Sequence, residues 1–434
     1  MSAMRISRLS ETEKLLHLIE CSTSPFHAVR EAMRQLEEAG YEPLDMKAGW
    51  DLVPGGKYFV SLYDSSLAAF RINPEFREGD MLRISASHTD WPCLRLKPVP
   101  ESQQGSYRRL SVECYGGLIQ NTWLDRPLSL AGRVALRGED AMHPEMRLVD
   151  YRRPVCTIPN LAIHMNREVN KGVELNRENE MQPLLGTGEP MDEPYFTRML
   201  ARELDVAPED ILWYEISVYN SDPGDVIGIE EDLISAPRLD NLTSVQASLS
   251  GLLSSEREDG IDAAFFFDNE EIGSATKQGA ASSILPFILE KIYLALGLGR
   301  EAFLGALSGC LLLSMDVGHA IHPNRPELYS RTNGIELNQG FVLKTAASQS
   351  YATDGETLAI IRALAAEREI PYRIFASRAD KPSGRTLGSM ASALLAARTV
   401  DVGVPILAMH SARELMGARD QQALCDLAQA FYAM

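Results

Sequence analysis

A short apolar run that leads directly into four polar residues constrains the fold of this chain more than any other stretch. Residues 263–267 are all apolar, and Asp268, Asn269, Glu270 and Glu271 follow without a linker. An apolar run this short, stopped by polar residues, is typical of a buried strand. Open α/β sheets bind ligands at the carboxyl ends of their strands, which is where this acidic cluster would lie. By itself, however, the cluster could also be a solvated loop.

Length and composition limit the classes of protein to which the chain can belong. With 434 residues it exceeds one typical core, so two domains are expected. Its 45% hydrophobic and 24% charged residues are ordinary for a soluble globular protein. The net charge of -18 and a pI near 5.0 disfavour nucleic acid and anionic membranes as partners.

The cysteines and the first residues indicate the cellular compartment. The six cysteines include no close pair, so we expect neither a cysteine-type zinc site nor a disulfide framework. Reduced thiols suit a reducing compartment. The chain starts with an amphipathic helical pattern, and no apolar segment approaches the roughly 18–20 residues of a membrane span. The expected location is the cytoplasm.

The pattern of apolar residues predicts a discontinuous α/β domain with an insertion. Two helices are expected between residues 10 and 40, separated near Ser24, which can cap the second helix, and Pro25, which can open it. Residues 93–236 contain short alternating strands between polar loops, which indicates a β-rich insert. Residues 1–92 plus 237–434 would form the α/β domain, a mostly parallel sheet flanked by helices. Its later elements are predicted as strands at 263–267, 311–314, 372–376 and 403–409 and helices at 240–253, 283–296, 355–368 and 412–434.

Four predicted strands end in side chains that can bind metal ions. In a parallel sheet such ends share one edge and can converge on one cleft. Asp240, which opens a predicted helix, can join them from a loop. These residues are His88 and Asp90 after strand 81–87, Glu270 and Glu271 after 263–267, Asp316 after 311–314, and His410 after 403–409.

The residue types at these strand ends indicate a metal centre. Imidazole and carboxylate ligands suit zinc, and also manganese, cobalt or iron. Two histidines with three or four acids exceed what one catalytic metal takes from a protein, and they fit two metals about 3.5–4 Å apart. Each histidine alone could be an ordinary hydrogen-bonded residue, but the recurrence at four strand ends favours a metal site.

Nine motifs that occur in a fixed order carry a family resemblance. They are SPFH at 24–27, SHTDWPCL at 87–94, YGG at 115–117, TWLDR at 122–126, LAIHMNR at 161–167, RLDNL at 238–242, DNEEIGS at 268–274, GHAIHPN at 318–324 and MHS at 409–411. Each motif is weak alone, whereas the ordered set is highly specific. Over nearly its whole length the chain resembles the aspartyl aminopeptidase family of metallopeptidases.

The resemblance implies a di-zinc exopeptidase that removes an N-terminal residue, Asp or Glu, from peptides. It assigns one zinc to His88, Asp240 and Asp316 and the other to Asp240, Glu271 and His410, with manganese or cobalt as alternatives. It also makes Glu270 the general base and Asp90 the residue that orients His88. The division of roles between the two glutamates comes from the resemblance and not from their spacing. The family further implies a homo-oligomer, commonly a dodecamer, with contacts through the inserted domain.

Three further residues are candidates for substrate contact, and three places depart from the family pattern. An acidic substrate side chain would need cations such as Lys344 or Lys381, and His319 lies just beyond Asp316. The departures are Asn121, Asn160 and residues 384–389, and they bear on specificity more than on catalysis. Two alternatives stay open: a related di-metal hydrolase of N-acyl amino acids or of carboxyl-terminal bonds, and an inactive scaffolding relative.

Overall fold

The computed structural model describes residues 9–172, 174–189, 195–381 and 384–434. The chain forms two compact units, which we call the α/β unit and the β unit. The α/β unit contains Met1–Asp90, Gly224–Met409 and Glu414–Met434, and the β unit contains Trp91–Pro223 and the short segment His410–Arg413. The sequence-based domain limits, after residues 92 and 236, remain a prediction; the compact units of the structure divide after Asp90 and Pro223.

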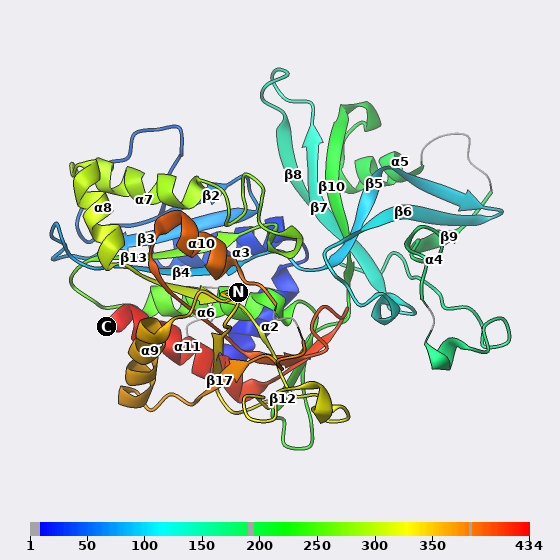
Figure 1. Cartoon of the computed structure of the whole chain (residues 1–434). Helices are drawn as coiled ribbons and strands as arrows, with labels where there is room; N and C mark the ends of the chain where they lie inside the picture. The colour runs from blue at the N-terminus through cyan, green and yellow to red at the C-terminus, as the bar shows by residue number, and fades with distance from the viewer. Residues whose placement is uncertain (1–8, 173, 190–194, 382–383) are drawn as a thin grey trace. The chain divides into compact units, whose positions relative to one another are not determined.

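A nine-stranded sheet forms the core of the α/β unit (Figure 1). Across the sheet the order is β1 (Glu42–Pro43), β2 (Lys57–Leu62), β3 (Ser66–Ile72), β13 (Ile261–Phe267), β4 (Leu82–His88), β14 (Leu311–Met315), β18 (Arg398–Gly403), β16 (Phe341–Thr345) and β17 (Tyr372–Ala376). The four central strands from β13 to β18 are mutually parallel, and β3 and β16 pair with them in antiparallel fashion. The predicted α/β class with a mostly parallel centre is confirmed.

The three neighbouring strands β13, β4 and β14 are buried along their whole length. Strands that are covered on both faces are expected to read as nearly continuous apolar runs, because helices replace solvent on each side. This explains why the short runs in the sequence located these strands correctly. Their carboxyl ends point to one edge of the sheet, since all three run parallel.

Helices cover both faces of this sheet (Figure 1). Side chains of α7 (Ile284–Ala295), α8 (Arg300–Gly309) and α10 (Leu387–Leu395) share one hydrophobic core with the sheet. The other face carries α6 (Leu239–Ser254), which packs against β4, β13, α11 (Ala418–Ala433) and α2 (Glu11–Cys21). The remaining long helices are α3 (Pro25–Glu38) and α9 (Gly355–Glu367). Among the described residues, no helix combines the length and the apolar character needed to cross a bilayer.

Helices α2 and α3 begin in different ways. Ser10 and Glu13 form a reciprocal capping box at the start of α2. Pro25 occupies the first turn of α3, as predicted. The expected side-chain cap by Ser24 is absent, because its hydroxyl lies 2.7 Å from Nδ1 of His27 instead.

The predicted strand at 403–409 and the predicted helix start at 412 are both wrong. The strand of the main sheet is β18, which ends at Gly403, and a separate short strand, β19 (Pro405–Leu407), joins a five-stranded sheet. Proline has no N–H to donate and is tolerated at the first position of a strand, so the main ladder cannot continue through Pro405. After β19 the chain forms β20 (Glu414–Gly417), and α11 begins only at Ala418. The other members of this sheet are β11 (Asp225–Ile227), β12 (Leu233–Ala236) and β15 (Gly318–His319).

The β unit contains a six-stranded antiparallel sheet, which agrees with the mostly β insert that the alternating pattern predicted. The order is β8 (Glu145–Asp150), β7 (Leu128–Leu136), β10 (Ile211–Asn220), β5 (Cys93–Gln104), β6 (Tyr107–Tyr115) and β9 (Leu184–Thr187). Helix α5 (Tyr195–Leu204) covers part of it with Phe196 and Leu200 buried.

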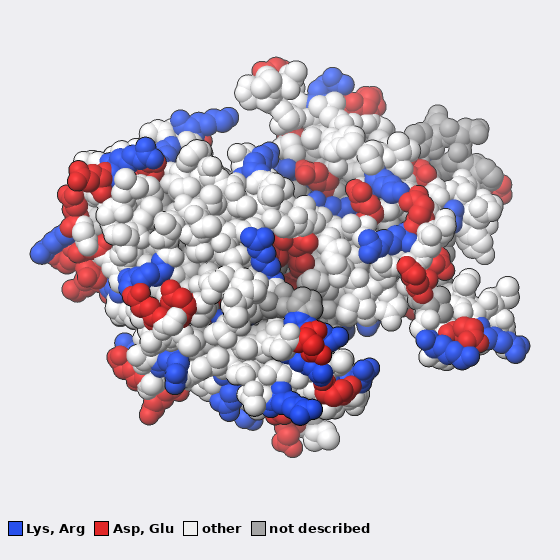
Figure 2. Space-filling model, viewed as in Figure 1, with Lys and Arg blue, Asp and Glu red and all other residues white. Residues whose placement is uncertain are grey.

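Charged side chains of both signs are intermixed on the face shown in Figure 2. Among the described residues on that face, neither sign forms a continuous patch.

Gly403 allows a close approach between β18 and the backbone of Asp316. A Cβ atom at position 403 would lie 1.6 Å from the carbonyl oxygen of Asp316. The N–H of Asp316 also donates to the carbonyl of Val402 at 2.9 Å. The missing side chain at 403 therefore fixes how the end of β14 lies against β18.

We expect Gly403→Ala to lower the free energy of unfolding by about 1–3 kcal/mol, because an added methyl group has no space there. The matched control is Gly305→Ala in α8, where an added Cβ meets nothing within 4 Å. This control should leave stability unchanged or raise it by up to about 1 kcal/mol, because alanine is the better helix former. Urea unfolding of both variants measures the difference, and equal effects would contradict the role given to Gly403.

Candidate metal centre

The ends of three adjacent strands bring most of the predicted site residues together. His88 is the last residue of β4 and pairs in register with Phe267, the last residue of β13. Glu270 and Glu271 follow β13 in a short 3-10 turn, and Asp316 follows β14, which lies on the other side of β4. Three of the four predicted strand ends therefore meet at one edge of the sheet.

His88 lies buried among carboxylates, with 1% of its surface exposed. Its Nε2 is 3.4 Å from Oδ1 of Asp240 and 3.7 Å from Oδ1 of Asp316. Its Nδ1 is 3.0 Å from the backbone oxygen of Asp90, to which it donates. This contact leaves Nε2 facing the two aspartates, the orientation that a metal-binding imidazole needs.

Asp240 reaches the strand ends from the start of α6. Its backbone is not helical, and its N–H donates to Oε2 of Glu414 at 3.0 Å. The next residue, Asn241, donates from Nδ2 to the carbonyl of Met315 at 2.9 Å. These two bonds attach the first turn of α6 to β20 and β14, and they hold Asp240 beside His88.

The carboxylate of Asp90 binds the turn that carries the two glutamates. Its Oδ1 accepts the N–H of Glu270 at 3.1 Å, and its Oδ2 accepts the N–H of Glu271 at 3.2 Å. Oδ1 also lies 3.4 Å from Nδ1 of His88. The sequence suggested only a link between Asp90 and His88, because spacing along the chain cannot reveal bonds to backbone N–H groups of another strand end.

His410 belongs to the same group, although it does not follow a strand of the main sheet. It lies just after β19 and has a left-handed backbone with φ of 66°. Its Nδ1 is 3.1 Å from the carbonyl oxygen of Gly117. Ligand atoms lie within 4.8 Å of one another in two groups that share Asp240, one with His88 and Asp316 and the other with Glu271 and His410.

The electrostatics of these residues are those of a site built for cations. Burial raises the pKa of Glu270 to about 8. The charges of Asp316, Asp90 and Asp240 raise it as well, whereas the charge of His88 lowers it. Burial and the charge of Asp240 likewise raise the pKa of Glu271 well above its usual range. Burial lowers the pKa of His88, but its aspartate partners outweigh burial and raise it. Imidazole and carboxylate donors in two groups with one shared carboxylate fit two zinc ions.

The chain matches the model of the aminopeptidase I zinc metalloprotease family (M18) over residues 18–432. A Clostridium novyi protein described as a probable M18 family aminopeptidase 2 is 42% identical over 418 residues, which cover 95% of this chain and 96% of that protein. The chain belongs to the M18 family of metallo-aminopeptidases. An Ectopseudomonas mendocina protein with the same description is 39% identical over 96% of this chain and 97% of its own length.

Solved structures agree with this assignment. In the cryo-EM structure of the Ape4 and Nbr1 complex, a chain that is 34% identical superposes with a TM-score of 0.94, and the match covers 99% of this chain and 86% of that one. The S. cerevisiae mApe1 dodecamer is 25% identical with a TM-score of 0.85, over 97% of this chain and 96% of that one. An M18 aminopeptidase from Thermotoga maritima shares the fold at 22% identity with a TM-score of 0.86, over 100% and 99% of the two chains. The predicted family of zinc metallopeptidases is therefore confirmed.

The three candidates for substrate contact in this M18 aminopeptidase have different surroundings. Lys344 is 1% exposed, donates to the carbonyl of Val317 at 2.8 Å, and has its Nζ 3.9 Å from Oδ2 of Asp316. His319 is exposed on the short strand β15. Lys381 is exposed in a loop where its N–H donates to Arg378. The Nζ of Lys344 therefore lies beside Asp316, a predicted metal ligand.

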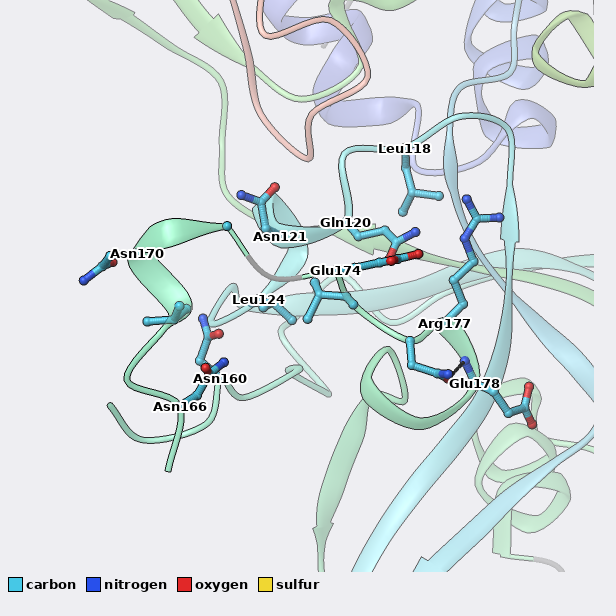
Figure 3. Close-up of a pocket in the computed structure, with 14 residues that line it drawn as sticks. Leu118, Gln120, Asn121, Leu124, Asn160, Asn166, Asn170, Glu174, Arg177 and Glu178 are labelled. Carbon is cyan, nitrogen blue, oxygen red and sulfur yellow. Dashed lines mark hydrogen bonds between the residues drawn. The ribbon is translucent and has the colours of Figure 1, made fainter. Parts of the chain in front are cut away.

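A cavity of about 940 Å³ in the β unit is lined by six amide side chains together with apolar and charged residues (Figure 3). Asn121 and Asn160, two of the departures from the family pattern, both line it. Asn160 is held by Asp125, whose oxygens accept its N–H at 2.9 Å and its Nδ2 at 2.7 Å. These bonds from Asn160 lower the pKa of Asp125. The two departures thus lie in one polar pocket.

We expect Asp90→Asn to reduce the zinc content and the activity of the folded protein. An amide would place NH₂ against the N–H of Glu270 or Glu271, and such an unmade buried bond costs about 1–3 kcal/mol. The matched control is Asp420→Asn, because Asp420 also accepts two backbone N–H groups, from Asn338 at 2.7 Å and Gly340 at 2.8 Å, outside the metal-ligand groups.

Both variants should lose similar stability in thermal or urea unfolding. Only Asp90→Asn should lose metal, measured by elemental analysis of the folded fraction, together with hydrolysis of an aminoacyl amide. Equal metal content in the two variants would show that Asp90 does not position the ligand turn.

Proposed function

We propose that this M18 enzyme is a two-zinc aminopeptidase that removes an acidic N-terminal residue from peptides. The observation that carries the proposal is the pair of ligand groups sharing Asp240, with Glu270 adjacent to Glu271 yet outside both groups. His88, Asp240 and Asp316 would hold one ion, and Asp240, Glu271 and His410 the other. Zinc bound there would polarise the scissile carbonyl and acidify a coordinated water. Manganese or cobalt would supply the same chemistry.

Glu270 is the proposed general base. Its carboxylate would accept a proton from the attacking water and pass that proton to the nitrogen of the leaving peptide. Asp90 binds the N–H of Glu270, so it would fix the position of the base as well as that of the ligand Glu271. A positioned general base typically accelerates such a step by about 10²–10⁴-fold.

We expect Glu270→Gln to lower kcat by about 10²–10⁴-fold while the bound zinc is retained, because the amide cannot take a proton. The matched variant is Glu271→Gln, one residue away, which should lose zinc as well as activity. Metal analysis beside single-substrate kinetics separates the two outcomes. Loss of zinc in Glu270→Gln with retention in Glu271→Gln would exchange their roles.

Lys344 supports the preference for acidic residues. It places a buried ammonium group beside Asp316, and a lysine has three N–H donors, of which the carbonyl of Val317 accepts one. A substrate carboxylate beside Asp316 would gain a charge-assisted hydrogen bond from this group. His319 and Lys381, which are both exposed, are proposed as further contacts with the substrate.

The preference is tested with amides of Asp, Glu, Leu and Lys and with the variant Lys344→Met. Removal of a charge-assisted bond worth about 1.5–3 kcal/mol should reduce kcat/KM for Asp relative to Leu by about 10–150-fold. Lys381→Met serves as the exposed counterpart and should change this ratio less. Faster hydrolysis of Leu than of Asp by the unchanged enzyme would remove the acidic preference and keep the metal mechanism. No metal-dependent release from any amide would refute the aminopeptidase function itself.

We also propose a homo-oligomer with contacts through the β unit. The S. cerevisiae relative forms a dodecamer, and the β unit exposes large apolar side chains. These are Leu161, Ile163, Met165, Leu212 and Trp213. Sedimentation analysis measures the assembled mass, and a mass of one 48.0 kDa chain would contradict this proposal.

A further inference from the structure

Three side chains of types that can ligate a metal ion lie close together on α2 and α3. His17 and Cys21 are four residues apart on α2 and therefore share one face of that helix. Glu31 comes from α3 and is buried. One ligand atom from each of these three residues lies within 4.8 Å of the others. None of the three belongs to the catalytic groups.

The distances fit a tetrahedral zinc-type site. Nε2 of His17 is 3.8 Å from Sγ of Cys21 and 3.7 Å from Oε1 of Glu31. Zinc bonds of about 2.0–2.1 Å to nitrogen or oxygen and about 2.3 Å to sulfur, at tetrahedral angles, place such donors roughly 3.3–3.6 Å apart. His17 therefore needs to approach each of its two partners by only a few tenths of an ångström, and the atoms of Cys21 and Glu31 lie within 4.8 Å of each other. The same nitrogen faces both partners, as one ligand atom must.

The surroundings hold the carboxylate in place and leave access for an ion. Arg34 donates to Oε2 of Glu31 at 2.8 Å and to Oε1 at 2.6 Å, and Gln35 donates to Oε1 at 3.2 Å. Bonds of this kind orient a metal-binding carboxylate. The side chain of His17 is 18% exposed, so solvent can reach the site and supply a fourth ligand. Because the charge of Arg34 offsets that of Glu31, the site should bind less tightly than the catalytic groups.

We propose that His17, Cys21 and Glu31 bind a zinc-type divalent cation that joins α2 to α3. The ion would be structural, because three protein ligands from two helices tie the helices together. The end of α2 also supports the segment before Asp240, since Arg238 donates to the carbonyl of Ile19 at 3.1 Å. Cation binding at this site therefore stabilises the helix that holds this segment.

The full-length protein, stripped by a chelator and titrated with Co²⁺, tests the proposal. Neither catalytic group contains a thiol, so a thiolate-to-cobalt charge-transfer band in the near ultraviolet reports binding at a cysteine. We expect the band in the unchanged protein and its loss in Cys21→Ser and in His17→Ala, with one metal equivalent fewer per chain in each. Cys114→Ser is the matched control, because Cys114 is the other cysteine of the described residues that is not fully buried, and it should keep the band.

Two further variants separate this site from the catalytic one and from misfolding. His88→Ala should keep the band even though it alters a catalytic ligand, so failure of the catalytic proposal would not affect this test. Glu31→Gln preserves most hydrogen bonds and should keep a weaker band that needs more Co²⁺. Circular dichroism checks the helices of each variant. Absence of the band in the unchanged protein, or its persistence in Cys21→Ser, would overturn the proposal.

Discussion

The concentration of carboxylates around one buried imidazole is the constraint on which the α/β unit depends. Asp90, Asp240, Asp316 and Glu270 all raise the pKa of His88, whose burial acts in the opposite direction. Such a group of like charges is costly inside a protein unless cations or hydrogen bonds compensate it. Parallel strands make the arrangement feasible, because their carboxyl ends place side chains from distant parts of the sequence at one edge without long loops.

The backbone supplies part of this compensation. Asp90 receives two N–H groups from the turn after β13, and Asp240 lies on a turn tied to β14 and β20. These bonds cross between elements, so the geometry of the ligands depends on the packing of the whole sheet edge. Gly403 belongs to the same support, since the close passage of β18 against Asp316 leaves no space for a side chain.

The sequence predicted the parts of this arrangement that depend on apolar runs. Strands β4, β13 and β14 are buried on both faces, so their short runs and polar ends identified both the strands and the residues that follow them. The strand that was predicted to end at His410 is not part of the main sheet, because the chain leaves that sheet at Pro405 and forms β19 in another one. The hydrogen bonds of Asp90 could not be predicted, because they join residues that are far apart in the sequence. The closeness of Glu31 to Cys21 depends on how two helices pack, which the sequence pattern does not show. The six dispersed cysteines suggested no metal role, although the i,i+4 spacing of His17 and Cys21 on one helix was visible.

Lys344 shows why specificity is harder to derive than catalysis. A buried ammonium 3.9 Å from Asp316 offsets charge in the ligand cluster, and the same position suits a cation that pairs with an acidic substrate. The two roles predict different losses of activity when Lys344 is removed and the substrate is neutral. If Lys344 only balanced Asp316, its removal would affect Leu and Asp substrates equally, because the metal ligands are common to both. If it also binds the side chain, the loss is larger for Asp than for Leu, since only a carboxylate gains a charge-assisted bond. The ratio of kcat/KM for Asp and Leu substrates therefore isolates the contribution of Lys344 to substrate binding. Neither the sequence nor the distance to Asp316 separates this contribution from charge balance.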